Sequence, residues 1–516
     1  MPRLILHILT ILAVFPVIAQ PAPAVEWQRN LGGSSDESGV SIEQASDGGY
    51  IVCGTTFSNN GDVTGNHGNA DIWVLKLNAS GSTEWQRCLG GTQPDNGKRA
   101  FELSGGGYLV LGNVRSNDGD VSGNHGMIDF WLARLATDGT LLWQRCYGGS
   151  LNDAPSDMKA TPDGGFIIAG ESRSNDGDLT ANAGSTDYWV LKLDSNFDIQ
   201  WQRSYGGSSG ESAFALALTS DGGYILNGIS SSNDGDVTGA FGAEDYWVVK
   251  LDALGNIQWQ RPCGGSDTDL GSIITEHSDG SFLALGTSFS QNGDVSAPLG
   301  SADLWSIRLS ALGQPFNERS YGGSNTDTGT AMSASADGAM VYSGTSRSAD
   351  GDLSMNQGMA DAWLFRIDNA GDILWSRILG GSQSDTFLAF NATDDGGYIA
   401  VGQSSSNDGD LPGNNGGGDV WVVKFGPDPV GIRAASRSAR LDLYPNPCID
   451  RLRVSSTCQP GVPTRWNIID GQGRIASEGS LSGGAIVIDV SPLSSGAYSL
   501  VMQCADGMAS APFVKE

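Results

Sequence analysis

Short runs of alternating hydrophobic and polar residues follow one another along the chain, with turn residues between them. In one stretch, residues 213–220 and 223–229 are strand-like and flank an Asp-Gly dipeptide, which is typical of tight hairpins. Residues 246–251 and 257–261 form a third and a fourth run. The 3.6-residue period of an amphipathic helix does not occur in the pattern. The pattern therefore predicts sets of four short antiparallel strands and an all-β chain.

This four-strand pattern repeats every 58 residues, seven times in succession. One tryptophan recurs in each third strand, at Trp73, Trp131, Trp189, Trp247, Trp305, Trp363 and Trp421. A second recurs in the fourth strand, at Trp27, Trp85, Trp143, Trp201, Trp259 and Trp375, and Asn317 replaces it in the remaining copy. Repeats of this length and strand number are typical of β-propeller blades. We therefore expect a seven-bladed β-propeller over residues 25–425.

The phase of the repeat predicts how the ring closes. The chain enters the repeat with the fourth-strand sequence of residues 25–29 and leaves it after the third-strand sequence of residues 421–424. The N-terminal strand should therefore complete the seventh blade. Such pairing would remove two exposed strand edges.

The residues outside the repeat indicate an exported protein. Residues 1–19 combine Arg3, an apolar stretch and a small final residue, which is typical of a secretory signal peptide. Residues 426–440 contain two prolines and several small residues and predict a linker. Residues 441–516 contain further strand-like runs and predict a separate β-rich domain. We expect no transmembrane segment, because no other stretch is sufficiently apolar.

The C-terminal domain carries several motifs in a fixed order. They are Leu443, Tyr444, Pro445, Asn446 and Pro447, then Asp470-Gly-Gln-Gly-Arg474, then a segment with Gly496 and Tyr498, and finally Phe513-Val-Lys515. These motifs resemble the type A C-terminal sorting domain of the type IX secretion system of Bacteroidota. The resemblance implies a β-sandwich that is recognised by the type IX secretion machinery and removed by a sortase-type peptidase, with the protein released or held at the outer-membrane surface. An ordinary ligand-binding β-domain is the alternative.

The repeats resemble bacterial secreted β-propeller repeats in their Asp-Gly-Gly-Tyr, Asn-Asp-Gly-Asp, Asp-Tyr-Trp-Val and Trp-Gln-Arg motifs. That resemblance implies no single activity. A formal net charge of −29 disfavours binding to nucleic acid or to anionic membranes. Cys448, Cys458 and Cys504 leave at least one thiol unpaired, so the C-terminal domain can hold at most one disulfide.

Acidic residues recur at matched positions around the long connection between the second and third strands of each copy. One set is Asp62, Asp120, Asp178, Asp236, Asp294, Asp352 and Asp410, and a second is Asp71, Asp129, Asp187, Asp245, Asp303, Asp361 and Asp419. Two residues before the first set stand Asp118, Asp176, Asp234, Asp350 and Asp408, with Asn60 and Asn292 in the other copies. A third set, Glu37, Asp95, Asp153, Glu211, Asp269, Asp327 and Asp385, lies where one copy crosses to the next. We expect all of them on one face.

Two interpretations of these acidic sets remain open. Oxygen-rich loops with Asn in place of some Asp suit Ca²⁺, which takes six to eight oxygen ligands. Alternatively, Asp and Asn before Gly shape turns by bonding to their own backbone, and no ion is required. If calcium binds, equivalent sites should occur in every blade.

The repeated tryptophans and the few histidines give little sign of an active site. The third-strand tryptophans are flanked by Val and Leu, which favours core packing, and folding the hairpin places Trp73 near Arg87. The clearest breaks in the repeat, Lys98-Arg99 and Asn317, match no known chemistry. We therefore expect a non-enzymatic binding or adhesion module for a glycan or protein. A secreted hydrolase or lyase that uses the loop carboxylates is the alternative.

Overall fold

The computed structural model describes residues 20–335, 338–429, 441–456, 464–470, 474–481, 486–504 and 507–516. It divides into two compact units, one over Ala22–Asp428 and one that includes Pro429–Glu516. We call them the repeat domain and the C-terminal domain. The expected signal peptide, residues 1–19, and residues 430–440 of the expected linker lie outside the described residues. Asp428, which the sequence assigned to the linker, belongs to the repeat domain, where its carboxylate accepts a hydrogen bond from Trp375 Nε1 at 2.8 Å.

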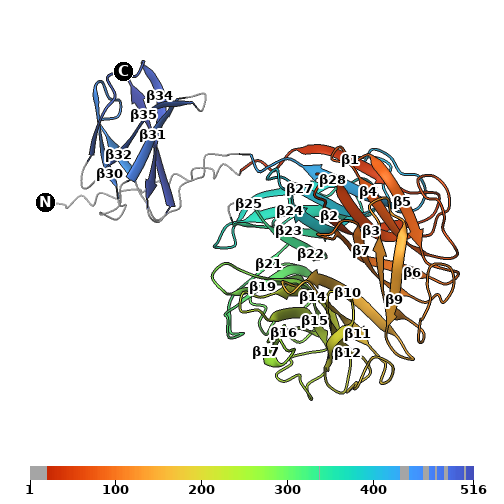
Figure 1. Ribbon diagram of the computed structural model, residues 1–516. Coiled ribbons are helices and arrows are strands. Elements are labelled where there is room, and N and C mark those ends of the chain that lie inside the picture. The colour runs from red at the N-terminus through yellow and green to blue at the C-terminus, as the bar shows by residue number, and fades with distance from the viewer. Residues whose placement is uncertain are drawn as a thin grey trace. The chain divides into compact units, whose positions relative to one another are not determined.

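The repeat domain consists of seven four-stranded antiparallel sheets arranged around a common centre (Figure 1). We call these sheets blades 1 to 7 in chain order. Blade 1 contains β2 (Glu37–Gln44), β3 (Tyr50–Thr56), β4 (Asp71–Leu77) and β5 (Thr83–Leu89), and blade 2 contains β6 (Asp95–Glu102), β7 (Tyr108–Val114), β8 (Asp129–Leu135) and β9 (Leu141–Tyr147). Blade 3 contains β10 (Asp153–Ala160), β11 (Phe166–Ser172), β12 (Asp187–Leu193) and β13 (Ile199–Tyr205), and blade 4 contains β14 (Glu211–Leu218), β15 (Tyr224–Ser230), β16 (Asp245–Leu251) and β17 (Ile257–Cys263).

The remaining blades follow the same order. Blade 5 contains β18 (Asp269–Glu276), β19 (Phe282–Ser288), β20 (Asp303–Leu309) and β21 (Pro315–Tyr321), and blade 6 contains β22 (Asp327–Ala334), β23 (Met340–Ser346), β24 (Asp361–Ile367) and β25 (Ile373–Leu379). Blade 7 contains β26 (Asp385–Ala392), β27 (Tyr398–Ser404), β28 (Asp419–Phe425) and, as its fourth strand, β1 (Val25–Leu31). The first strands of neighbouring blades lie next to one another, so they line the centre of the domain.

The N-terminal strand completes blade 7, as the phase of the repeat predicts. β1 pairs antiparallel with β28, with Gln28 opposite Val423 and Leu31 opposite Val420. A hydrogen bond also links blade 7 to blade 1. The backbone N–H of Glu37 donates to the carbonyl of Gly418 at 2.6 Å. The first and last blades are therefore joined by hydrogen bonds.

The third-strand tryptophans are fully buried in the repeat domain, which confirms their role in the core. The predicted proximity of Trp73 to Arg87 is wrong. A β-bulge between Lys76 and Leu77 shifts the register, so that Trp73 lies opposite Cys88, and Arg87 lies opposite Val74. The Trp73 indole N–H donates instead to the side chain of Gln86, at 2.8 Å.

The C-terminal domain has two sheets around one hydrophobic core. The smaller contains β29 (Leu441–Tyr444), β30 (Arg451–Ser456) and β33 (Ile486–Asp489), and the larger contains β32 (Ile475–Leu481), β31 (Thr464–Asp470), β34 (Gly496–Cys504) and β35 (Gly507–Lys515). Leu452 and Ile488 from the smaller sheet pack with Ile468, Leu500 and Phe513 from the larger. Buried side chains from both sheets thus hold the domain together.

Cys448 in the C-terminal domain is a free, buried thiol, and burial raises its pKa. It therefore contributes no disulfide. Within the described parts of the chain, no helix is long and apolar enough to cross a membrane.

Candidate functional site

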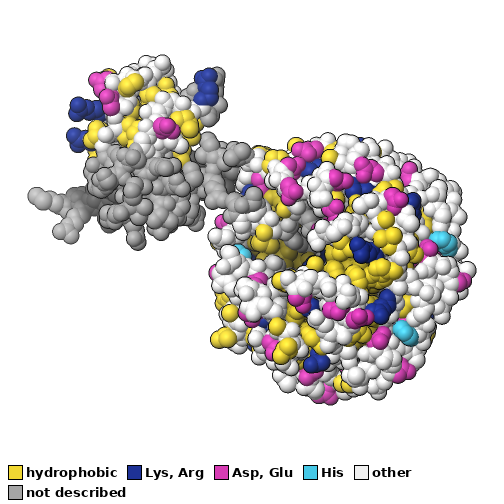
Figure 2. Space-filling model, viewed as in Figure 1, with side chains coloured by type: hydrophobic (Ala, Val, Ile, Leu, Met, Phe, Trp, Pro, Cys, Tyr) yellow, Lys and Arg dark blue, Asp and Glu magenta, His cyan; other side chains and the backbone are white. Residues whose placement is uncertain are grey.

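The long connections between second and third strands lie beside the crossings from blade to blade, on one face of the repeat domain. In blade 3, the N–H of Asp178 donates to the carbonyl of Gly148 in the crossing from blade 2, at 3.0 Å. The equivalent bond recurs in all seven blades. The structure thus confirms that the acidic sets share one face. Figure 2 shows acidic side chains distributed around the visible surface of this domain rather than gathered in one patch.

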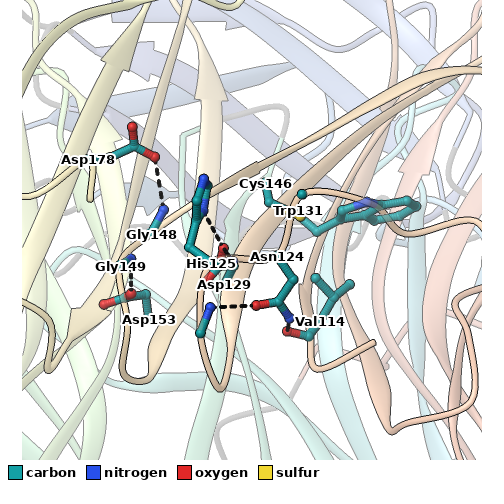
Figure 3. Close-up of polar contacts among 12 residues, drawn as sticks. Val114, Asn124, His125, Asp129, Trp131, Cys146, Gly148, Gly149, Asp153 and Asp178 are labelled. Atoms are coloured by element: carbon teal, nitrogen blue, oxygen red, sulfur yellow. Dashed lines mark hydrogen bonds and ion pairs between the residues drawn. The ribbon is translucent and has the colours of Figure 1, made fainter. Parts of the chain in front are cut away.

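The crossing carboxylates are buried and act as caps for the backbone. Asp153 accepts the N–H of Gly149 at 2.7 Å (Figure 3) and the hydroxyl of Ser174 at 2.8 Å. Its other oxygen accepts the hydroxyl of Ser172. The bond to the glycine four residues earlier recurs in every blade. These acids therefore fix the crossings.

The two acidic positions in the long loop also bond to the crossing. Asp178 Oδ2 accepts the N–H of Gly148 at 3.0 Å (Figure 3), and Asp176 Oδ1 accepts the N–H of Ser150 at 2.7 Å. The bond to Asp176 has an equivalent in each blade, with Asn60 and Asn292 as the acceptors where Asp is absent. Asp294 differs, because Arg261 pairs with its carboxylate at 3.4 Å.

In each acid at the start of a third strand, one carboxylate oxygen accepts a hydrogen bond and the other does not. Asp129 Oδ2 accepts the N–H of His125 at 2.8 Å and pairs with His125 Nδ1 at 2.7 Å (Figure 3). Its Oδ1 is buried and has no hydrogen-bond partner, and the same holds for Asp71, Asp187, Asp245, Asp303, Asp361 and Asp419. Burial raises the pKa of all seven carboxyls, to about 6 for Asp361 and Asp419.

This arrangement bears on the calcium hypothesis. Each crossing brings together one residue of every acidic set, yet their oxygens are directed mainly at backbone N–H groups. Across the described ranges, no group of three or more His, Cys, Asp or Glu side chains is arranged to hold a metal ion. The geometry matches the loop-shaping interpretation, and calcium binding stays a prediction.

A second group of charged residues lies at the centre of the domain, where the repeat breaks. Arg99 on β6 pairs through Nε with Asp157 on β10 at 2.6 Å and through a terminal nitrogen with Glu43 on β2 at 3.4 Å. Lys159 pairs with the other oxygen of Asp157 at 3.4 Å. We call these four residues and Lys98 the central cluster. The chain of ion pairs spans the first strands of three consecutive blades.

In the central cluster, burial and ion pairing shift the pKa values of Asp157 and Arg99 in opposite directions. Burial raises the pKa of Asp157, but Arg99 and Lys159 outweigh that effect, and the pKa is lowered. Burial also lowers the pKa of Arg99, yet Asp157 and Glu43 raise it above its usual value. Lys98 makes no ion pair with any described residue, and burial lowers its pKa. It is therefore an available cation in this part of the molecule.

The sequence shows Lys98-Arg99 as a break in the repeat but does not connect it to a site. The connection follows from register, because Arg99 and Asp157 occupy equivalent positions 58 residues apart and thus lie on neighbouring strands. Phe214, at the Lys98 position of blade 4, is 40% exposed. Figure 2 shows Lys and Arg side chains beside hydrophobic ones in the hollow of the domain. Lys98 and Phe214 thus stand at the same position of the repeat in different blades, and the residue at this position differs between those blades.

Residues 442–516 match the family model of the secretion system C-terminal sorting domain. This match agrees with the motifs Leu443–Pro447, Gly496, Tyr498 and Lys515. The C-terminal domain is therefore a type IX sorting domain, and the protein is exported to the cell surface or the extracellular space.

The chain has more distant similarities to other proteins. The regulatory protein FlaEY of Caulobacter vibrioides is 28% identical over 165 residues, which cover 29% of this chain and 17% of that protein. PorZ of the Porphyromonas gingivalis type IX secretion system is 11% identical, with a TM-score of 0.29, over 94% of this chain and 75% of PorZ. The WD40 domain of Neurospora crassa Pan2 is 11% identical, with a TM-score of 0.41, over 78% of this chain and 96% of that domain.

Proposed function

We propose that the protein is a non-enzymatic binding or adhesion module, exported by its sorting domain and built as a closed, seven-bladed β-propeller. The central cluster is the observation that carries this proposal. The loop face repeats almost unchanged from blade to blade, whereas the centre holds charged and aromatic residues that occur once. A specific ligand needs such unequal surroundings, and rigid scaffolds commonly present them in a concave site.

The ligand that suits this centre is a glycan or protein with an acidic group. Lys98 supplies an unpaired ammonium group, and Arg99 is already engaged by two carboxylates. Phe214 offers a partly exposed ring on which an apolar or sugar face can lie. A carboxylate on the ligand would therefore be attracted to Lys98 in a protein that otherwise repels anions.

The alternative is a secreted hydrolase or lyase that uses the loop carboxylates. Acid–base catalysis by two carboxylates needs environments that separate their pKa values at one site. Here the same carboxylate arrangement occurs at every blade crossing, and most of its oxygens already accept backbone N–H groups. These features favour binding over catalysis.

The further fate of the protein follows from its sorting domain. We propose that the type IX machinery binds this domain and that a sortase-type peptidase cuts between the two domains, within residues 430–440. The product would then be released or attached at the outer-membrane surface.

An array of neutral and uronic-acid-containing glycans, probed with the chain from Gln20 onward, tests the proposed function. We expect binding to acidic glycans that Lys98→Gln reduces at least tenfold. Arg347→Gln, at an exposed position outside the centre, is the matched control. Equal binding by both variants, or turnover of a glycan by the wild-type protein, would contradict the proposal.

A further inference from the structure

One boundary between blades lacks an aromatic ring that the other six possess. At the boundary between blades 4 and 5, the indole of Trp259 lies so close to Gly313 that an added β-carbon would be 2.6 Å from the ring. Between blades 5 and 6, Asn317 takes the place of the tryptophan. The facing glycine is kept there as Gly371, with a φ of +87°.

A second ring is missing at the same boundary. Trp85 packs edge-on against Tyr108 with ring centroids 5.5 Å apart, and Trp259 packs against Phe282 at 5.7 Å. The equivalent of Tyr108 and Phe282 in blade 6 is Met340. Both members of the aromatic pair are thus replaced, although all four strands of each of the two blades are present.

The hydrogen-bond acceptor for an indole remains. Trp85 Nε1 donates to the carbonyl of Thr137 at 3.0 Å, and Trp259 Nε1 donates to the carbonyl of Ala311 at 3.1 Å. The equivalent residue in blade 6 is Asn369, which lines a pocket at this boundary together with Asn317 and Met340.

The cation that covers the indole also remains. Arg203 lies over the ring of Trp201 with its guanidinium carbon 5.9 Å from the centroid. Arg319 is the equivalent residue beside Asn317, and it lines the same pocket.

Arg319 lies against Gly371, where an added β-carbon would be 3.3 Å from its Cδ and 3.6 Å from its Nη1, so an entering ring has to displace it. Arg319 pairs with Asp372 at 2.9 Å, as Arg145 pairs with Asp198 at 2.9 Å beside an indole that is present, Trp143. The Arg145 pair shows that an arginine–aspartate ion pair of this kind can exist beside an indole. The pocket has a volume of about 50 Å³, several times the roughly 10–15 Å³ that one water needs. It is open to a ligand group.

We propose that this groove binds the indole side chain of a tryptophan from a partner polypeptide. Three parts of the indole site are retained, namely the glycine, the acceptor carbonyl and the arginine, whereas the indole and its aromatic partner are absent. Asn317 is exposed and makes no hydrogen bond to a described residue, so its amide can pair with a peptide group beside the incoming ring. The groove is lined by β21, the outer strand of blade 5, and by second- and third-strand residues of blades 5 and 6. None of its lining residues belongs to the central cluster, so the proposal is independent of the function proposed above.

The proposal is tested by titrating the chain from Gln20 onward, labelled at its methionine methyl groups, with N-acetyl-tryptophanamide. Met340 lines the groove and is 7% exposed, so a bound indole should shift its methyl resonance upfield in a saturable manner. Met340→Leu assigns the resonance, and N-acetyl-leucinamide should cause no shift.

Asn317→Trp provides the decisive variant, because it restores the ring found at the other boundaries. We expect it to raise the melting temperature by about 2 °C and to abolish the response to N-acetyl-tryptophanamide. An unaltered or lower melting temperature, or a response that persists in this variant, would overturn the proposal. A response to free indole without one to the blocked amino acid would overturn the assignment to a polypeptide.

Discussion

The carboxylates of Asp361 and Asp385 meet at Gly380, where an added β-carbon would lie 2.2 Å from Asp361 Oδ1 and 3.0 Å from Asp385 Oδ2. Asp361 belongs to blade 6 and Asp385 to blade 7, so the two acids connect neighbouring blades. The Oδ1 of Asp361 is buried without a partner, and burial, assisted by Asp385, raises its pKa to about 6. Two buried carboxylates near each other store unfavourable energy at neutral pH.

This relationship predicts that the repeat domain is more stable at mildly acidic pH. A carboxyl whose folded pKa is about 6 rather than 3.8 binds its proton more tightly when folded, so stability rises as the pH falls from about 7 to 4. At 1.36 kcal/mol per pKa unit, the difference is ~3 kcal/mol for one such group. Below pH 4 the trend should reverse, because Lys192 and Lys250 hold the pKa values of Asp163 and Asp221 at about 2. Melting curves from pH 3 to 8 test this.

Asp361→Asn assigns that pH dependence to one residue. An amide cannot ionise, and its N–H can donate to Asp385, so we expect a melting temperature at pH 7.5 equal to or above that of the wild type. The gain on acidification should shrink. Asp394→Asn, at an exposed loop position, should change neither quantity. A destabilised Asp361→Asn protein with full pH dependence would refute this account.

Calcium binding is testable at the acids that begin the third strands, each of which has one buried carboxylate oxygen without a hydrogen-bond partner. If Ca²⁺ binds, Asp129→Asn should reduce the calorimetric stoichiometry by about one ion and leave the other sites intact. If the acids only shape loops, the chelator-treated protein should bind no calcium and melt at an unchanged temperature. The described geometry leads us to expect the second result. A melting temperature that rises on addition of calcium would show that the expectation is wrong.

The pairing of β1 with β28 predicts that the N-terminal strand is needed for stability. Removing Val25–Leu31 would expose the edge of β28 and leave Trp421 Nε1 without its acceptor, Gln28, which lies 3.1 Å away. We expect a lower melting temperature or aggregation in size-exclusion chromatography. A chain that starts at Gln20 is the control. An unchanged melting curve from a monomeric deletion variant would argue against closure by this strand.

The sorting domain predicts the location of the protein in its host. A chain that stops after Arg440 should fold as the repeat domain and remain in the periplasm, because the recognised domain is absent. Cell fractionation with an antibody to the repeat domain measures this, and the full-length chain is the control. Surface display of the truncated chain at normal levels would exclude a sorting role for residues 442–516.

The sequence predicts strands and their order because the 58-residue period repeats hydrophobic alternation without interruption. It does not predict bulges, so the pattern places Trp73 near Arg87, whereas the structure places it opposite Cys88. It also identifies the acidic sets without telling whether an oxygen faces an ion or an amide. The direction of the Asp153 and Asp178 side chains depends on backbone N–H groups in the crossing. Positions where the repeat fails, such as Lys98 and Asn317, are therefore the better guides to function.

The pair formed by Arg99 and Asp157 predicts strong coupling at the centre of the domain. Asp157 is 3% exposed and Arg99 18%, so removing the arginine leaves a buried carboxylate with Lys159 as its remaining ion-pair partner. We expect Arg99→Met to lower the free energy of unfolding by ~3 kcal/mol. Asp157→Asn should partly restore stability to Arg99→Met, because the amide carries no charge and its oxygen can still accept the N–H of Leu216, now 3.1 Å from Asp157. A double-mutant cycle from denaturant unfolding measures the coupling, and additive effects of the two changes would show that the pair does not hold the centre together.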